Sequence, residues 1–160
     1  YRVGVLGATG AVGSTILEIL AERDFPASEV VPFASARSEG RALQFGDSKI
    51  NCVVPSDETI KSIDILISSA GGSVSAEWAP KFAEAGAVVV DNTSFWRMHE
   101  DVPLVVAGVN DEAAQNHKGI VANPNCTTMV MMMALAPIHR AAGLERLIIS
   151  SAEDASRKSS

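Results

Sequence analysis

The stretch Val3-Gly-Val-Leu-Gly-Ala-Thr-Gly-Ala-Val-Gly13 decides the fold. Its apolar beginning, closed by Gly7, predicts a short buried β-strand, and the 3.6-residue periodicity of 11–23 predicts a helix directly after the loop. A glycine-rich turn between a strand and a helix is typical of α/β proteins that bind dinucleotides. The side chains expected on the buried face of this helix are Val12, Ile16, Ile19 and Leu20.

The three glycines of this loop have separate roles in a phosphate-binding turn. Gly7 permits the tight turn, Gly10 lets backbone amides approach a pyrophosphate, and Gly13 lets the helix pack closely on the strand. The helix N-terminus adds free N–H groups and partial positive charge. The spacing G-x-x-G-x-x-G differs from the more usual G-x-G-x-x-G, and a plain packing turn is the alternative. The place of the loop in the first strand–turn–helix unit favours phosphate binding.

Beyond this unit, apolar segments alternate with helical ones. Because the apolar segments are rich in Val and Ile and lack polar alternation, they predict parallel strands buried on both faces and joined by right-handed crossovers. The predicted fold class is therefore α/β, a doubly wound, mostly parallel sheet of Rossmann-like type. The strands are expected at 30–34, 63–69, 87–90, 104–107, 120–122 and 144–150, with one or two short ones in 41–54, and the helices at 76–85, 111–117 and 126–142.

The end of the second predicted strand indicates which nicotinamide cofactor is bound. NAD enzymes usually carry an Asp or Glu there, which holds the ribose 2′-hydroxyl. Here the residues are Ser35, Arg37 and Ser38, and the first acid is Glu39. Guanidinium and hydroxyl groups suit a 2′-phosphate, so the sequence favours NADP. The alternative is that Arg37 is only a solvated loop charge.

The segment Asn123-Pro-Asn-Cys-Thr-Thr128 carries the candidate nucleophile. Asn125 is a good helix N-cap, which places Cys126 in the first turn of a long helix. The dipole and free amides there favour the thiolate that attacks carbonyls and can stabilise an oxyanion. Asn125 and Cys126 are therefore the candidate catalytic residues. Cys52, expected inside a strand, is interpreted as a packing residue.

Composition excludes several classes of partner. A formal net charge of −6 disfavours nucleic acid, and no apolar run approaches the ~20 residues that span a bilayer. Two cysteines, with no disulfide framework, fit the cytoplasm. No metal site is expected, and none of the three histidines is assigned to catalysis.

Several motifs occur together in this order: the glycine loop, Ala34-Ser-Ala-Arg-Ser38, Asp91-Asn-Thr-Ser94 with Arg97, Val102-Pro-Leu-Val105, Val109-Asn110, and the cysteine segment. Together they resemble the bacterial aspartate-semialdehyde dehydrogenase family, over nearly the whole chain up to Ser151. The resemblance implies reduction of β-aspartyl phosphate by NADPH through a thioester on Cys126, a step toward lysine, methionine and threonine. It also implies that full-length members are homodimers or homotetramers.

The resemblance assigns roles to individual residues. Thr9, Gly10, Ala11 and Val12 would line the cofactor phosphates, Arg37 and Ser38 would hold the 2′-phosphate, and Arg97 would bind the substrate phosphate. A cation after a strand-end loop can also reach an anionic leaving group on chemical grounds alone. The alternative for Arg97 is a surface ion pair.

The sequence departs from the family after its last predicted strand. Residues 152–158 lack the expected Tyr-Gln-x-Val-Ser-Gly pattern, and the family's second domain, with its general base, does not follow. The expected domains are therefore a dinucleotide-binding domain, 1–125, and a nucleophile helix with the start of a truncated catalytic domain, 126–160, with little activity alone. The alternative functions are N-acetyl-glutamyl-phosphate reductase and a non-catalytic NADP-binding or regulatory module.

Overall fold

The computed structural model describes residues 1–150. These residues belong to two compact units, one from Tyr1 to Pro124 and one from Asn125 onward. The departure from the family pattern at 152–158 lies outside the described residues. The first unit holds the sheet and the second holds a long helix.

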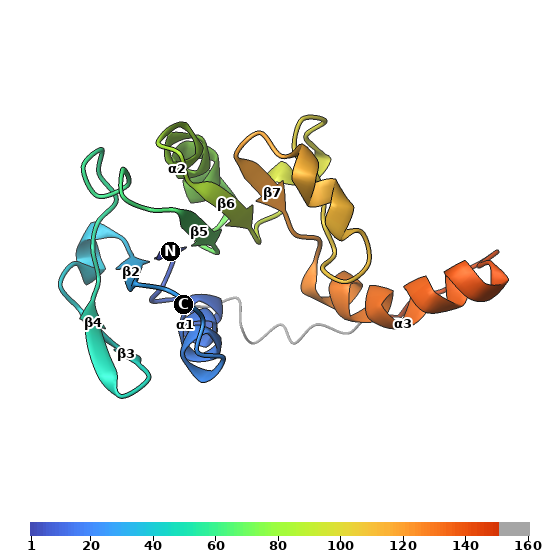
Figure 1. Ribbon diagram of the computed structural model, residues 1–160, viewed down its shortest axis with the longest axis horizontal. Helices are drawn as coiled ribbons and strands as arrows, with labels where there is room; N and C mark the ends of the chain where they lie inside the picture. The colour runs from blue at the N-terminus through green and yellow to red at the C-terminus, as the bar shows by residue number, and fades with distance from the viewer. Residues whose placement is uncertain (151–160) are drawn as a thin grey trace. The chain divides into compact units, whose positions relative to one another are not determined.

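The sheet of the first unit has five strands in the order β2-β1-β5-β6-β7, and all neighbours are parallel (Figure 1). The chain leaves β1 for β2 on one side and then returns to β5 on the other side, so the order reverses between β1 and β5. This confirms the predicted doubly wound α/β fold. The strands are β1 (Arg2–Leu6), β2 (Glu29–Phe33), β5 (Ile65–Ser68), β6 (Val88–Asp91) and β7 (Ile120–Ala122).

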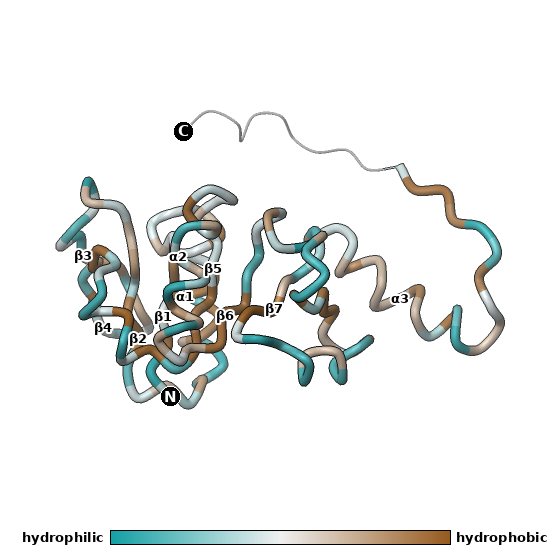
Figure 2. The backbone as a smooth tube through the Cα atoms, turned by 90° about the horizontal axis from the view of Figure 1, so that it is seen from above, coloured by the Kyte–Doolittle hydropathy of each residue, from teal (hydrophilic) through white to brown (hydrophobic). Residues whose placement is uncertain are grey.

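Helices α1 (Ala11–Glu22) and α2 (Gly72–Glu84) cover opposite faces of this sheet (Figure 1). Alternate strand residues point to opposite faces, so the sheet contributes to two apolar clusters. Leu66 and Val89 pack with Phe82 of α2, whereas Val3 and Val5 pack with Leu17 of α1. Figure 2 shows hydrophobic colour along strands such as β2 and β6.

The buried face of α1 matches the prediction only in part, because Leu20 is buried and Ile16 half-buried as expected but Val12 and Ile19 are not. Gly13, Leu17 and Leu20 are buried, whereas Val12 is 49% exposed and Ile19 is 40% exposed. A Cβ at Gly13 would lie only 2.2 Å from the backbone oxygen of Gly7. The close approach of Gly13 to the loop therefore fixes the rotation of α1, and this rotation turns Val12 and Ile19 outward.

Between β2 and β5 the chain forms an antiparallel hairpin of β3 (Ala42–Phe45) and β4 (Ser48–Asn51). The two short strands expected in 41–54 are thus present. Cys52 follows β4 instead of lying within it, which corrects the expectation of a strand position. Its backbone is still paired, because its N–H donates to the Arg41 carbonyl oxygen at 2.8 Å. Val53 then forms a parallel bridge with Phe33 at the edge of the main sheet.

Two predicted strands are absent from the described residues. In 104–107 only Leu104 forms a bridge, to Ala122, because the Asn110 side chain binds the backbone there. Its Oδ1 accepts from the Val106 N–H at 2.7 Å, and its Nδ2 donates to the Leu104 carbonyl at 3.0 Å. Side-chain bonds of this kind replace ladder bonds. The segment 144–150 pairs with no strand within residues 1–150 and stays irregular.

The helix predictions were correct in place but not always in type or length. Helix α2 begins at Gly72 instead of 76, and Asp111–Asn116 is a 3₁₀-helix (η3). Helix α3 (Cys126–Ala142) begins and ends at the predicted residues, and Gly143, with φ of +74°, follows its end. Within residues 1–150 no helix is both long and apolar enough to cross a membrane.

Candidate functional site

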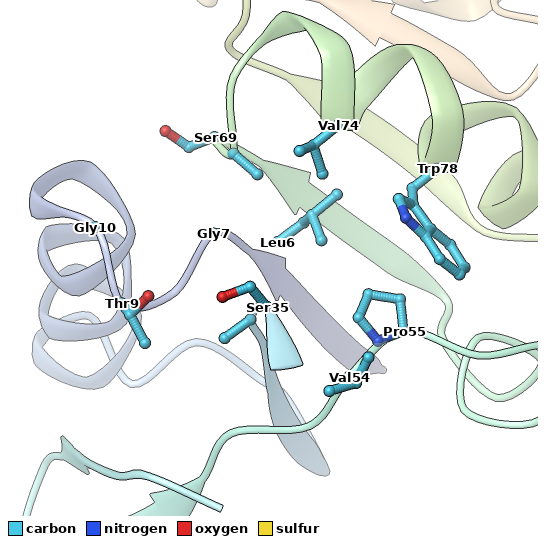
Figure 3. A pocket seen from close by; sticks show the side chains of 12 residues that line it. Leu6, Gly7, Thr9, Gly10, Ser35, Val54, Pro55, Ser69, Val74 and Trp78 are labelled. Atoms are coloured by element: carbon cyan, nitrogen blue, oxygen red, sulfur yellow. The ribbon is translucent and has the colours of Figure 1, made fainter. Parts of the chain in front are cut away.

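A cavity of about 450 Å³ opens at the carboxyl ends of β1, β2 and β5, where the strand order reverses (Figure 3). This is the position at which open α/β sheets bind ligands, and the volume lies within the range of small-molecule sites. The cavity is lined by Leu6, Gly7, Thr9, Gly10, Ala34, Ser35, Val54, Pro55, Ser69, Ala70, Val74 and Trp78.

The glycine loop forms one side of this cavity. Gly7 has φ of +86°, a conformation that side chains rarely adopt, and its N–H donates to the Phe33 carbonyl at 3.0 Å. Gly10 is the N-cap of α1 and provides no side-chain cap, so N–H groups of the first turn stay available for an anion. An apolar cavity wall next to unpaired amides fits the adenine and phosphate groups of a dinucleotide.

The predicted cofactor residues fall into four groups. Gly7, Thr9, Gly10 and Ser35 line the cavity. The others lie beside it: Ala11 and Val12 are exposed in the first turn of α1, Gly13 is buried under the loop, and Arg37 and Ser38 lie in the 3₁₀-helix η1 (Ala36–Ser38) that follows β2.

Sequence reasoning missed the cavity wall opposite the glycine loop. Figure 3 shows Val74 and Trp78 of α2 on this side, with Pro55 across from Trp78. The indole ring of Trp78 is held by Phe82, whose ring centroid lies 6.5 Å away, and by the Lys81 ammonium at 4.1 Å. The Gly71-Gly72 turn marked a loop at this sheet edge, but Trp78 had the pattern of an ordinary core residue.

Arg97 lies at the same carboxyl edge of the sheet, in the 3₁₀-helix η2 (Trp96–Met98). Its Nε donates to the Asn123 carbonyl at 2.8 Å, and its Nη2 donates to the Asn92 carbonyl at 3.2 Å. A guanidinium has five N–H donors, so these two bonds leave three unused within residues 1–150. In that part of the chain no carboxylate pairs with Arg97, so the alternative interpretation as a surface ion pair does not apply there.

In the second unit, Cys126 is the first residue of α3 and Asn125 is its N-cap, as predicted. The Asn125 Oδ1 accepts from the Thr127 N–H at 2.9 Å and lies 4.0 Å from the Cys126 Sγ. The two thiols differ in accessibility, since Cys126 is exposed and Cys52 is only 3% exposed. Burial raises the pKa of the Cys52 thiol, and the nearby Arg41 charge opposes this shift.

Comparison with known proteins places the chain in a family. Residues 2–117 match the family described as semialdehyde dehydrogenase, NAD binding domain. The aspartate-semialdehyde dehydrogenase of Aquifex aeolicus is 52% identical over 153 residues, which are 94% of this chain and 45% of that protein. The chain thus spans about half the length of the curated relatives it matches.

Solved structures give the same result. The aspartate semialdehyde dehydrogenase II of Vibrio cholerae, solved in complex with ASA, is 48% identical with a TM-score of 0.84, over 90% of this chain and 48% of that one. The Candida albicans enzyme, solved with NADP, is 26% identical with a TM-score of 0.67, over 89% of this chain and 48% of that one. These findings confirm the predicted resemblance, and the chain belongs to the semialdehyde dehydrogenase family, as a relative of the aspartate-semialdehyde dehydrogenases.

Proposed function

We propose that this chain binds NADP and provides the nucleophile for the reduction of β-aspartyl phosphate to aspartate semialdehyde. The observation that carries the proposal is the exposed Cys126 at the N-terminus of α3, capped by Asn125, in a chain similar to aspartate-semialdehyde dehydrogenases. The product would feed lysine, methionine and threonine synthesis. The complete protein would work in the cytoplasm as a homodimer or homotetramer.

Cys126 would act as the attacking group. Partial positive charge at the N-terminus of α3 favours the thiolate, and the free amides of the first turn can receive the oxyanion that forms on the acyl carbon. The Sγ–C bond forms as the C–O bond to phosphate breaks, which leaves an aspartyl thioester on Cys126. Asn125 keeps this turn in place through its bond to the Thr127 N–H.

Arg97 would bind the phosphate of the substrate. Its three unused N–H donors suit the oxygens of a phosphate group, which guanidinium binds through paired bonds. The two carbonyl bonds of Arg97 orient the guanidinium before the substrate arrives. This preorganisation avoids part of the ordering cost of binding.

The cofactor would lie in the cavity at the switch point of the sheet. When bound there, NADPH would supply the hydride that converts the thioester to the aldehyde and releases the Cys126 thiolate. Among the residues of this chain, Thr9 and Gly10 would contact the pyrophosphate together with the amides of Ala11 and Val12. Ser35, Arg37 and Ser38 would hold the 2′-phosphate, because they follow β2 directly.

The preference for NADP is tested by replacing Arg37 with alanine. Charge-assisted bonds contribute about 1.5–3 kcal/mol, so we expect about a tenfold to hundredfold weaker NADPH binding and almost unchanged NADH binding. The measurement is a fluorescence titration with each cofactor. Arg41→Ala, an exposed arginine close by in the chain, is the matched control and should change neither affinity. An equal loss for both cofactors would count against the assignment.

The substrate is tested by comparing two acyl phosphates on one preparation. We expect β-aspartyl phosphate to release inorganic phosphate and leave an aspartyl adduct on the protein, detected by mass spectrometry. N-acetyl-γ-glutamyl phosphate should give neither, because the chain is similar to aspartate-semialdehyde dehydrogenases. An adduct only with the glutamyl compound would replace the proposed substrate. If neither compound forms an adduct while NADPH still binds, the chain is a non-catalytic cofactor-binding module and the proposed reaction is wrong.

A further inference from the structure

A buried carboxylate lies beside the arginine of the proposed phosphate site. Asp91, the last residue of β6, is 0% exposed, and within residues 1–150 it has no lysine, arginine or histidine as an ion-pair partner. Removing a carboxylate from water costs several kcal/mol unless hydrogen bonds replace the lost hydration. Three donors do so here: the Ser75 Oγ at 2.5 Å, the Thr93 N–H at 2.8 Å and the Thr93 Oγ1 at 2.6 Å.

These bonds fix the backbone that leads from β6 to Arg97. The Asp91 Oδ1 binds the N–H two residues on, and the Thr93 Oγ1 in turn accepts from the Phe95 N–H at 3.2 Å. Two consecutive side-chain turns therefore hold the chain from Asp91 to Phe95. The carbonyl of Asn92, inside this segment, is one of the two oxygens that the guanidinium of Arg97 binds.

Ser75 connects this segment to α2. Its Oγ donates to the Asp91 Oδ2 at 2.5 Å and accepts from the Trp96 Nε1 at 2.9 Å, and its side chain is 0% exposed. Trp96 directly precedes Arg97. A hydroxyl can donate one hydrogen bond while it accepts another, so Ser75 links the carboxylate of Asp91 to the indole ring of Trp96 and holds the ring in place.

We propose that Ser75 is a positioning residue for Arg97. Through the Asp91–Ser75–Trp96 chain of hydrogen bonds, Ser75 sets the position of η2, so that the guanidinium of Arg97 reaches the carbonyls of Asn92 and Asn123 and presents its unused donors to a phosphate group. This proposal rests on the proposed function of Arg97. Ser75 does not line the cofactor cavity, although Val74, its neighbour on α2, does. The proposal therefore predicts a change in phosphate binding without a change in cofactor binding.

The test is a titration with inorganic phosphate, followed by NMR through the backbone amides of 92–97 and Asn123. We expect Ser75→Ala to weaken phosphate binding about tenfold, and NADPH affinity to stay within about twofold. Trp96→Phe keeps an aromatic ring at this position but removes the indole N–H together with the pyrrole part of the ring, so it should cause at least a similar loss. Ser73→Ala, an exposed serine in the same turn of α2, is the matched control and should bind phosphate as the wild type does.

A double variant separates positioning from general destabilisation. Arg97→Lys removes the fork of donors, and Ser75→Ala should cause no further loss of phosphate affinity in the Arg97→Lys background. If the losses in phosphate affinity add in the double variant, the positioning role is wrong. It is also wrong if Ser75→Ala binds phosphate as tightly as the wild type. If Ser75→Ala does not fold, wild-type phosphate binding by Trp96→Phe has the same meaning. If Arg97→Lys itself binds phosphate as tightly as the wild type, the proposed function loses its phosphate site and the positioning role falls with it.

Discussion

Replacing Cys126 with serine is expected to slow phosphate release from β-aspartyl phosphate by about 10⁴-fold or more. A serine hydroxyl is much less acidic than a cysteine thiol, and the deprotonated form is the attacking nucleophile. The structure contains no histidine in the first turn of α3 that could activate a hydroxyl instead. The measurements are the initial rate of phosphate release and the mass of the protein after reaction.

Cys52 is the control for this experiment. It is buried beside the hairpin, and burial raises the pKa of its thiol, so Cys52→Ser should leave the rate and the adduct unchanged. NADPH binding should be intact in both variants, because neither thiol lines the cavity. If the adduct persists in Cys126→Ser and disappears in Cys52→Ser, the nucleophile has been misassigned.

The second large effect is expected at Gly13. In Gly13→Ala the new methyl group would lie 2.2 Å from the Gly7 oxygen and 2.7 Å from the Ala8 Cα, and both of these atoms belong to the backbone. Helix α1 must then move away from β1, which disturbs the packing of Leu17 and Leu20. We expect the free energy of unfolding to fall by about 3 kcal/mol and the melting temperature by about 10 °C.

Gly10→Ala is the matched control, because it makes the same change in the same loop. A Cβ at Gly10 meets only the Gly7 oxygen, at 3.4 Å, and the backbone there is extended with φ of −80°. We expect a loss of at most about 1 kcal/mol, since alanine is a poorer N-cap than glycine. Urea unfolding followed by circular dichroism measures both variants. Equal stability of Gly13→Ala and the wild type would show that α1 can move without cost.

The sequence predicted correctly those elements that are determined by interactions between residues close together in the chain. The glycine loop predicted the β1–loop–α1 unit, because a tight turn from a strand into a closely packed helix requires residues without a side chain, as at Gly7 and Gly13. Asn125 specified the start of α3, because its side chain caps a helix wherever that helix packs. The prediction of a strand at 104–107 was wrong, because hydrogen bonds from the Asn110 side chain replace strand pairing there. The pattern of apolar residues does not reveal such side-chain bonds.

The cavity wall and the Asp91 network could not be read from the sequence. Val54 and Trp78 come from two separate segments, and only the strand order brings them to one edge of the sheet. The sequence places Asp91 in a family motif at the end of a predicted strand, but it does not show which groups the carboxylate contacts. Its complete burial, and its link through Ser75 to Trp96, depend on how α2 packs over β6.

The sequence by itself thus determined the class of fold, the glycine-rich loop between β1 and α1, and the helix that begins at Cys126. The loop and the start of the helix follow from backbone conformation and capping over a few neighbouring residues, and the fold class follows from the alternation of apolar and helical segments along the chain. Tertiary structure alone decided which face of α1 is buried, because this depends on the contact between Gly13 and the Gly7 backbone. It also decided where Arg97 points, because its bonds to the Asn92 and Asn123 carbonyls join the ends of two strands that are adjacent only in the folded sheet.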